Sequence, residues 1–182
     1  IPSTRNTGTP TMSKPTPGSP APGFTAPVIG GSYPAGAKVT LSNLRDRPVV
    51  LYFYPKDDTP GCTTQACGLR DIWRTLGRKA HVFGVSVDPL RKHARFIDKY
   101  ELPFPLISDE DHTIVEAYGV WVEKTLYGRK YMGTERSTFV IGIDGKIKAV
   151  LEKVKPEKHA EQLLATLRSG RSTGTAPRIA IG

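Results

Sequence analysis

Cysteine and histidine are both scarce in this sequence. Its 182 residues include two cysteines, Cys62 and Cys67, and four histidines. A secreted scaffold held together by disulfide bonds would need more cysteines. A structural zinc site would need four ligands at suitable spacing, and the histidines lie far from the cysteine pair, at positions 81, 93, 112 and 159. We therefore expect neither a metal nor another cofactor, and two cysteines five residues apart favour redox chemistry.

Long apolar runs are also absent. The sequence has no stretch of about 18 apolar residues, so we expect no membrane-spanning helix. Residues 1–23 contain no apolar stretch of the length that a secretory signal requires. We expect a cytoplasmic protein by default. An organellar or exported form stays open, because the sequence starts with Ile1 rather than methionine.

Acidic residues are fewer than basic ones, 17 against 26, which gives a formal net charge of +9. Such a charge is compatible with binding to nucleic acid or to an anionic surface. However, the basic residues do not alternate with aromatic ones, and Arg91, Arg95 and Lys99 recur every four residues, as on the exposed face of a helix. The charge therefore favours solubility. A nucleic-acid-associated or chaperone-like protein without enzymatic activity remains an alternative.

Composition divides the chain into three parts. Proline, serine, threonine and glycine dominate residues 1–17, which we predict to be a disordered tail because they cannot bury enough apolar surface to offset the entropy of ordering. Residues 169–182 read as a basic C-terminal tail. Residues 18–168 suit one globular domain with a sizeable core.

Within this domain, predicted strands and helices alternate. Residues 48–54 form a continuous apolar run, typical of a strand buried on both faces of a sheet. Asp144-Gly145 is a strong hairpin turn. The predicted strands are 38–41, 48–54, 81–87, 104–107, 138–143 and 146–151, and the predicted helices are 62–76, 89–100, 111–118 and 156–167. This order predicts an α/β protein, a three-layer α/β/α sandwich around a mixed central sheet with the outline of a thioredoxin-like fold.

The segment around the two cysteines carries the chemistry. It follows a buried strand and opens a helix, so Cys62 lies in or near the first turn, where unpaired backbone N–H groups and the helix dipole favour an anion. The thiolate is the reactive form of cysteine, and a free thiol at pH 7 is mostly protonated. A helix end typically contributes only about 0.3–1 kcal/mol, so we expect an arginine or lysine nearby as well.

The motifs in this segment resemble those of a known family. Pro55, Thr59 and Cys62 match the peroxiredoxin pattern P-x-x-x-T-x-x-C, and DDTPGCTTQAC is similar to the PrxQ subfamily, also called bacterioferritin comigratory protein. The resemblance extends over about 18–167 and includes GSPAPGFT, ISDED, YGVW and GRKYMGTERSTFVI. Gly23 departs from it, because family members usually have aspartate there.

The resemblance implies a role for several residues. Arg136 matches the active-site arginine, which would bind both the thiolate and a peroxide oxygen. Thr59 would relay hydrogen bonds between sulfur and peroxide, Pro55 would help to exclude water, and backbone N–H groups around Gly61 and Cys62 would bind the peroxide. In the alternative interpretation, Thr59 is only a turn or cap residue and Arg136 is an ordinary surface arginine. Pro55 could end a strand, which is compatible with its role in the pocket.

The resemblance also implies a catalytic cycle. Cys62 would reduce hydrogen peroxide or an organic hydroperoxide and become a sulfenic acid, and Cys67 would condense with it to form an intramolecular disulfide. Thioredoxin, or alternatively glutaredoxin, would reduce the disulfide, and the chain would act as a monomer. In a second interpretation, Cys67 is only a small core residue and an external thiol resolves Cys62.

The spacing of the cysteines has a geometric consequence. Residues five apart on an ideal helix have Cα atoms about 8.7 Å apart, whereas disulfides rarely tolerate more than about 7 Å. We therefore predict that the first turns of this helix unwind in each cycle. A general thiol–disulfide oxidoreductase is the alternative enzyme, but such enzymes place their cysteines two residues apart, as C-x-x-C.

Other candidate residues receive less specific interpretations. We read Asp57 and Asp58 as solvated loop residues, since a carboxylate beside a thiolate would disfavour the anion. Trp121, Tyr127 and Tyr131 could line the pocket or a surface for the electron donor, but core packing is the favoured interpretation. The histidines have no sequence partner at catalytic spacing and are assigned no role.

Overall fold

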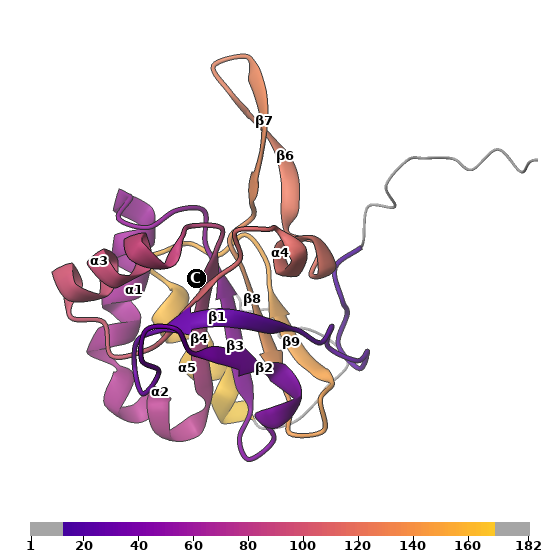
Figure 1. The fold of residues 1–182 in the computed structure, drawn as a ribbon. Helices are drawn as coiled ribbons and strands as arrows, with labels where there is room; N and C mark the ends of the chain where they lie inside the picture. The colour runs from indigo at the N-terminus through magenta and orange to yellow at the C-terminus, as the bar shows by residue number, and fades with distance from the viewer. Residues whose placement is uncertain (1–12, 170–182) are drawn as a thin grey trace, which may run out of the picture.

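A seven-stranded mixed sheet forms the centre of the computed structural model, which describes residues 13–169 (Figure 1). Across the sheet the order is β2-β1-β5-β4-β3-β8-β9. Strands β3, β4 and β5 run parallel, and the remaining pairs are antiparallel. The strands are β1 Thr25–Ile29, β2 Lys38–Thr40, β3 Val49–Phe53, β4 His81–Ser86, β5 Leu106–Ser108, β8 Ser137–Ile141 and β9 Ile147–Leu151.

Strand β3 is buried along its whole length because both faces of the sheet are covered. Val49, Leu51 and Phe53 point into one hydrophobic core, whereas Val50 and Tyr52 point into the other. This alternation of two apolar faces explains the continuous apolar run in the sequence. The predicted three-layer α/β/α sandwich is confirmed.

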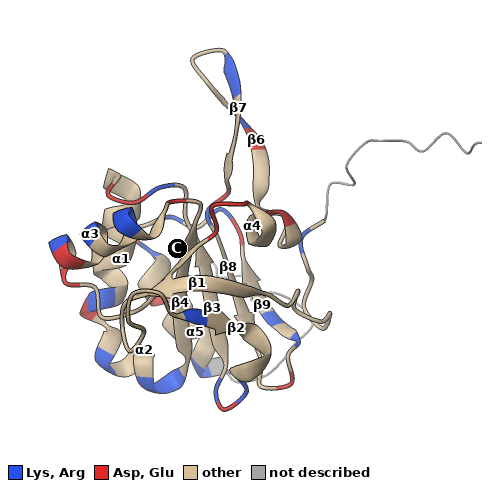
Figure 2. Ribbon diagram, in the orientation of Figure 1, with Lys and Arg blue, Asp and Glu red and all other residues tan. Residues whose placement is uncertain are grey.

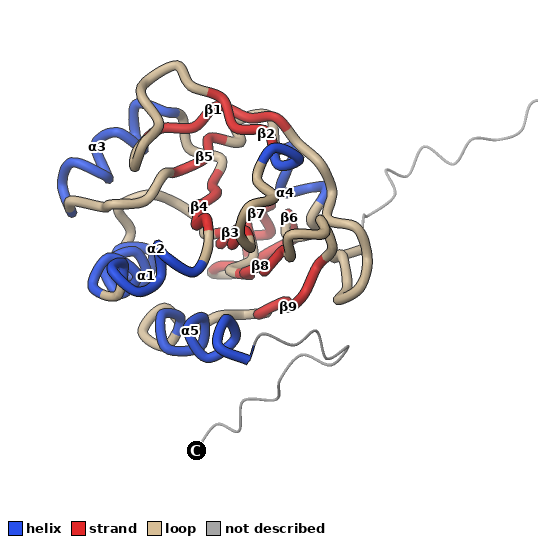
Figure 3. The backbone as a smooth tube through the Cα atoms, turned by 90° about the horizontal axis from the view of Figure 1, so that it is seen from below, coloured by secondary structure: helices blue, strands red, loops and turns tan. Residues whose placement is uncertain are grey.

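Helices cover the two faces unequally. α1 Pro60–Asp71, α2 Trp73–Lys79, α3 Leu90–Tyr100 and α5 His159–Ser169 contribute side chains to one core. The short α4 Thr113–Ala117 contributes to the other core. Figure 3 shows α1, α2 and α5 side by side along one side of the sheet. The crowded face therefore holds the cysteine-bearing helix α1.

Several predicted bounds differ from the structure. The single helix expected over 62–76 is two helices, because Ile72 leaves the helical backbone conformation with φ −106° and ψ 10°. Strand β1 was not predicted, because it is short and contains Pro27. The expected hairpin over 138–151 is present as β8 and β9.

A second hairpin, absent from the predicted elements, projects from the body of the protein (Figure 1). It consists of β6 Trp121–Leu126 and β7 Arg129–Thr134, joined through Tyr127 and Gly128, both with positive φ. In Figure 2 the ribbon of β7 is blue in part, which marks Lys and Arg residues there. Core packing was the wrong interpretation for two aromatic residues: Tyr127 is 95% exposed and Tyr131 47% exposed, because the hairpin extends away from the sheet. Trp121, at its base, does pack against the core and stacks on His112.

Most residues of the two predicted tails, 1–17 and 169–182, are not among those that the structure describes. Residues 1–12 and 170–182 are outside the described residues, so the predicted tails remain predictions there. Residues 13–17, which the predicted N-terminal tail also includes, are described, and Lys14 forms a salt bridge with Glu135. Among residues 13–169, no helix has the length and apolar character needed to cross a membrane.

Candidate active site

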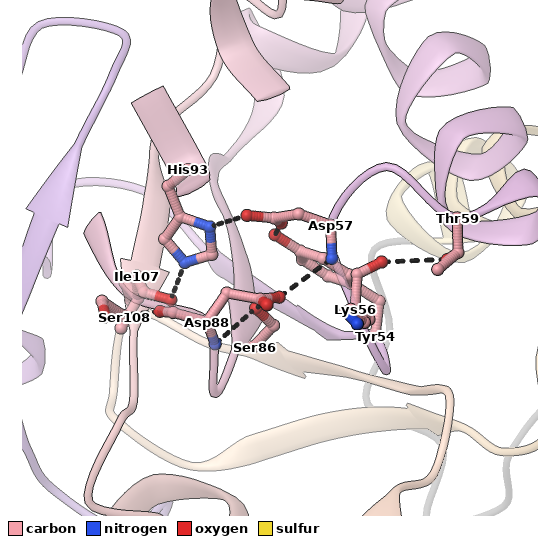
Figure 4. Close-up of polar contacts among 9 residues, drawn as sticks. All are labelled: Tyr54, Lys56, Asp57, Thr59, Ser86, Asp88, His93, Ile107 and Ser108. Atoms are coloured by element: carbon pink, nitrogen blue, oxygen red, sulfur yellow. Dashed lines mark hydrogen bonds and ion pairs between the residues drawn. The ribbon is translucent and has the colours of Figure 1, made fainter. Parts of the chain in front are cut away.

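Cys62 lies in the first turn of α1 and is 2% exposed. Thr59 is the N-cap residue and Pro60 occupies the first turn, where its missing N–H costs nothing. The Thr59 hydroxyl does not cap the helix but donates to the Lys56 carbonyl oxygen at 2.9 Å (Figure 4). The backbone N–H groups of Gly61 and Cys62 have no partner within the helix, and the first turn contains no acidic residue. Free backbone donors and the positive end of the helix dipole are thus present beside Cys62, an arrangement that attracts anionic ligands.

Arg136 is the cationic residue that the sequence analysis expected near Cys62. Its Nη2 donates to the Cys62 Sγ at 3.4 Å, across 74 positions of sequence. The sheet register explains the meeting: Ser137 at the start of β8 pairs with Phe53 at the end of β3, so the residue before Ser137 arrives beside the loop that leads to Cys62. A Cβ atom at Gly61 would lie 3.1 Å from Arg136 Nη2, so this close approach favours glycine there.

A buried chain of hydrogen bonds continues behind the arginine. Arg136 Nη1 donates to Gln65 Oε1 at 2.5 Å, and the Gln65 amide meets His159 Nδ1 at 3.1 Å. His159 Nε2 lies 2.8 Å from the Thr138 hydroxyl. Burial, and secondarily the charge of Arg136, lowers the pKa of His159 to about 3. The sequence assigned no role to His159, because its partner Gln65 lies 94 positions away.

A second buried network holds the loop before α1 (Figure 4). Asp57 accepts from the Tyr54 hydroxyl at 2.5 Å, and its other oxygen is 2.6 Å from His93 Nδ1. The Asp57 N–H donates to Asp88 Oδ2 at 2.9 Å, and His93 Nε2 is 2.9 Å from the Ile107 carbonyl oxygen. The prediction that Asp57 is a solvated loop residue was therefore wrong, because its side chain is buried and the residue is only 8% exposed.

The neighbouring Asp58 does face solvent, as predicted. It accepts from Lys99 Nζ at 2.9 Å and from the Tyr100 hydroxyl at 2.7 Å. These hydrogen bonds lower the pKa of the Asp58 carboxyl, the one to Lys99 most. The two adjacent aspartates therefore differ in role, since Asp58 joins the loop to α3 at the surface and Asp57 does so in the interior.

Cys67 lies on the same helix as Cys62 and is half-buried. Both thiols are free, and α1 runs without interruption from Pro60 to Asp71. The helical spacing therefore separates the two sulfur-bearing residues, as the sequence predicted. Cys67 is not a member of either buried core cluster.

Comparison with known proteins shows the family of the chain. The model of the AhpC/TSA family matches residues 17–150. The chain belongs to this family. Within the family its relatives are peroxiredoxins of the Bcp and PrxQ type, and the activity they support is that of a thiol peroxidase. Cys62, at the start of α1, is thus the candidate nucleophile of a peroxiredoxin.

The relatives match most of the peroxiredoxin domain. Peroxiredoxin Bcp of Bacillus subtilis is 45% identical over 134 residues, which are 73% of this chain and 85% of that protein. Peroxiredoxin Bcp of Escherichia coli is 44% identical over 134 residues, 73% of this chain and 86% of that protein.

Solved structures agree with the fold. The bacterioferritin comigratory protein of Xanthomonas campestris, described for its alkyl peroxide reduction activity, aligns with a TM-score of 0.75 and 34% identity over 81% of this chain and 91% of its own. Peroxidoxin BcpB of Mycobacterium tuberculosis aligns with a TM-score of 0.73 and 36% identity over 86% of this chain and 99% of its own. The thioredoxin-like fold expected for a peroxiredoxin is therefore confirmed.

The structure brings together most of the site residues that the sequence singled out. Cys62, Gly61 and Arg136 meet at the start of α1, with Thr59 at its N-cap and Pro55 in the loop before it. Sequence reasoning missed residues that hold this group from behind. Gln65 offered one signal, because it is a polar residue three positions after Cys62 and is 1% exposed on the core-facing side of the helix.

Proposed function

We propose that the Cys62 thiolate reduces hydrogen peroxide and organic hydroperoxides. The sulfur attacks the terminal peroxide oxygen, the O–O bond breaks, and the leaving oxygen takes a proton and departs as water or alcohol. The observation that supports this most is the guanidinium of Arg136, 3.4 Å from the Cys62 sulfur. There it can stabilise the thiolate and the charge that develops on the peroxide oxygens.

The backbone at the helix start would complete the peroxide site. The N–H groups of Gly61 and Cys62 have no partner within the helix and are available to a peroxide oxygen. The Thr59 hydroxyl donates to the Lys56 carbonyl oxygen in this structure. Once it leaves that oxygen, it would donate a hydrogen bond to the peroxide or accept one from it. Pro55, half-buried beside this loop, would limit water around the sulfenic acid.

In the second step of the proposed cycle, Cys67 condenses with the Cys62 sulfenic acid, forming a disulfide and releasing water. The bond needs the Cα atoms within about 7 Å, so α1 must unwind between the two cysteines. Gly61, Gly68 and the polar residues 63–65 make unwinding less costly than it would be in a leucine-rich helix. Because both cysteines belong to one helix, one chain suffices for the cycle, which supports a monomer.

Thioredoxin is the proposed reductant, with glutaredoxin as the alternative. Its dithiol would attack the 62–67 disulfide, pass through a mixed disulfide and leave both cysteines of this chain reduced. The cytosol keeps thiols reduced, so we expect the cycle in that compartment. A coupled assay with thioredoxin, its reductase and NADPH should show peroxide-dependent NADPH consumption, and glutaredoxin with glutathione serves as the comparison.

The test is the intact mass of the protein after one equivalent of peroxide. Wild type should lose two hydrogens, whereas Cys67→Ser should gain one oxygen or form an adduct with added thiol, and Cys62→Ser should not change. A mass loss of two hydrogens in wild type that persists in Cys67→Ser would contradict the internal disulfide. Equally slow peroxide consumption by wild type and Cys62→Ser, together with tight DNA binding, would instead favour the nucleic-acid-associated alternative.

A further inference from the structure

Arg136 is held in place from behind by a side-chain amide. Gln65 accepts from Arg136 through Oε1, and this carbonyl end of the amide is the only part of it that can accept. The NH₂ end of the same amide must then point away from the arginine, where it meets His159 Nδ1 at 3.1 Å. The orientation of Gln65 therefore depends on what His159 offers at that nitrogen.

His159 satisfies the amide in only one protonation state. Nδ1 has to accept from Gln65, so it carries no proton, and the single ring proton sits on Nε2 and is donated to the Thr138 hydroxyl at 2.8 Å. His159 is fully buried, with the ring of Tyr52 beside it at 5.7 Å between centroids. The low pKa of His159, caused by burial and then by Arg136, keeps the ring neutral at physiological pH.

A different state of His159 would disturb the arginine. If Nδ1 carried a proton, it would face the Gln65 NH₂ group, and two donors would meet in a buried place. Turning the amide over would relieve that contact but would direct the NH₂ group at the Arg136 guanidinium. Either way, Arg136 would lose the acceptor that holds one side of its guanidinium while the other side contacts Cys62.

We propose that His159 is a positioning residue for the reaction of Cys62 with peroxide. From α5 it fixes the Gln65 amide, and Gln65 in turn orients Arg136 toward the sulfur. This inference rests on the proposed peroxidase function. It assigns a role to a helix that is far from Cys62 in sequence and packs directly against α1.

Two substitutions at His159 separate positioning from packing. His159→Leu fills a similar volume but offers no acceptor to Gln65. His159→Asn leaves a small void, yet its side-chain oxygen branches from the same carbon as Nδ1 and retains the acceptor. We expect His159→Leu to lower the single-turnover rate of Cys62 with hydrogen peroxide by about 10- to 100-fold, the effect of a small misplacement of a catalytic group. His159→Asn should stay within about threefold of wild type, although it leaves the larger packing defect.

Arg136 provides the control for the mechanism. In an Arg136→Ala background, adding His159→Leu should change the peroxide rate less than about twofold, while the loss of melting temperature caused by His159→Leu persists. The rate at which thioredoxin reduces the preformed disulfide should not change in either His159 variant, since that step does not use Arg136. Thr138→Val removes the acceptor of Nε2 without changing volume, and we expect a smaller rate loss of about two- to fivefold. It serves as the test if His159→Leu does not fold.

Three results would overturn the proposal. The first is a peroxide rate of His159→Leu equal to wild type, the second is an equal rate loss in His159→Asn and His159→Leu, and the third is a His159→Leu rate loss that persists without Arg136. If Cys62 of the wild-type protein does not react with peroxide, the proposed peroxidase function is wrong. If wild type reacts and one of the three results above is found, only the positioning role of His159 is wrong.

Discussion

Two histidines are fully buried, one on α3 and one on α5, and their ring nitrogens meet partners of different kinds. His93 on α3 directs both ring nitrogens at oxygens, Asp57 Oδ2 at 2.6 Å and the Ile107 carbonyl at 2.9 Å. His159 on α5 meets an amide donor with one nitrogen and a hydroxyl with the other. Two histidines that are equally buried can therefore have quite different hydrogen-bond partners.

The partners of the ring nitrogens distinguish the two sites. At His93 both nitrogens face oxygens, one of a carboxylate and one of a backbone carbonyl, whereas at His159 one of the two partners is an amide N–H donor. At His159, one proton satisfies both nitrogens and the ring stays neutral. Asp57 thus directs both carboxylate oxygens at buried partners, Tyr54 and His93. The first histidine anchors the loop before α1, and the second supports the arginine.

The largest expected effect is on the buried contact between Asp57 and His93. Asp57→Ala leaves His93 without its partner and should lower the free energy of unfolding by about 3–5 kcal/mol. Asp57→Asn should cost much less, about 1 kcal/mol. Its oxygen can still accept from Tyr54, and its NH₂ group can donate to a neutral His93. Urea denaturation of the three proteins measures the difference, and equal losses in both variants would show that the pair needs its charge.

The pH dependence of stability sharpens the contrast at His159. Its pKa is lowered in the folded state to about 3, so between pH 6.5 and 3 the unfolded chain binds a proton that the folded chain does not. The stability that neutral His159 provides is thus complete above pH 6.5 and is lost as the pH falls, by up to about 1.4 kcal/mol per pH unit. Relative to His159→Asn, wild type should lose about 2 kcal/mol between pH 7 and pH 5.

Wild type and His159→Asn must be measured side by side, because the buried carboxyl of Asp109 changes stability with pH in the opposite direction. Burial raises the pKa of Asp109 to about 6, so the folded state takes up a proton there first and gains stability as the pH falls toward 4. Denaturation of wild type and His159→Asn at each pH cancels this contribution. A stability difference that stays constant between pH 7 and pH 5 would show that His159 is not held neutral.

The smallest expected effect concerns Tyr52, whose ring lies beside His159. Within the described residues its buried hydroxyl has no hydrogen-bond partner, which makes Tyr52 a neighbour of the His159 network and not a member of it. Tyr52→Phe should therefore raise the melting temperature slightly, by the equivalent of about 0–1 kcal/mol, and leave the peroxide rate unchanged. A clear loss of stability would mean that the hydroxyl has a partner after all.

Local patterns in the sequence predicted much of the fold. The apolar run of β3 and the Asp144-Gly145 turn each depend on neighbouring residues only, and the structure has both features. The β6–β7 hairpin escaped prediction because much of it faces solvent, so its residues lack the simple alternation of a half-buried strand. Family resemblance, and not local pattern, singled out Arg136 among 26 basic residues.

The supporting residues of the site were beyond the reach of the sequence. Gln65 and His159 are 94 positions apart, and Asp57 and His93 are 36 apart. Each pair meets only because a helix docks on the sheet at a particular angle, and side-chain periodicity does not encode that angle. A buried polar residue on an otherwise apolar helix face, such as Gln65, indicates that a partner exists but not which residue it is.

The central claim is that Arg136 activates Cys62 toward peroxide. Its most direct test is the single-turnover rate of Cys62 oxidation by hydrogen peroxide, measured in wild type, Arg136→Ala and Arg129→Ala. Arg129 is an exposed arginine on the projecting hairpin and serves as the matched control. Loss of the Arg136 guanidinium should slow the reaction by about 10²- to 10³-fold, as for the removal of one donor from a preorganised anion site. Arg129→Ala should react at the wild-type rate. Equal rates in wild type and Arg136→Ala would contradict the proposal that this arginine activates the cysteine.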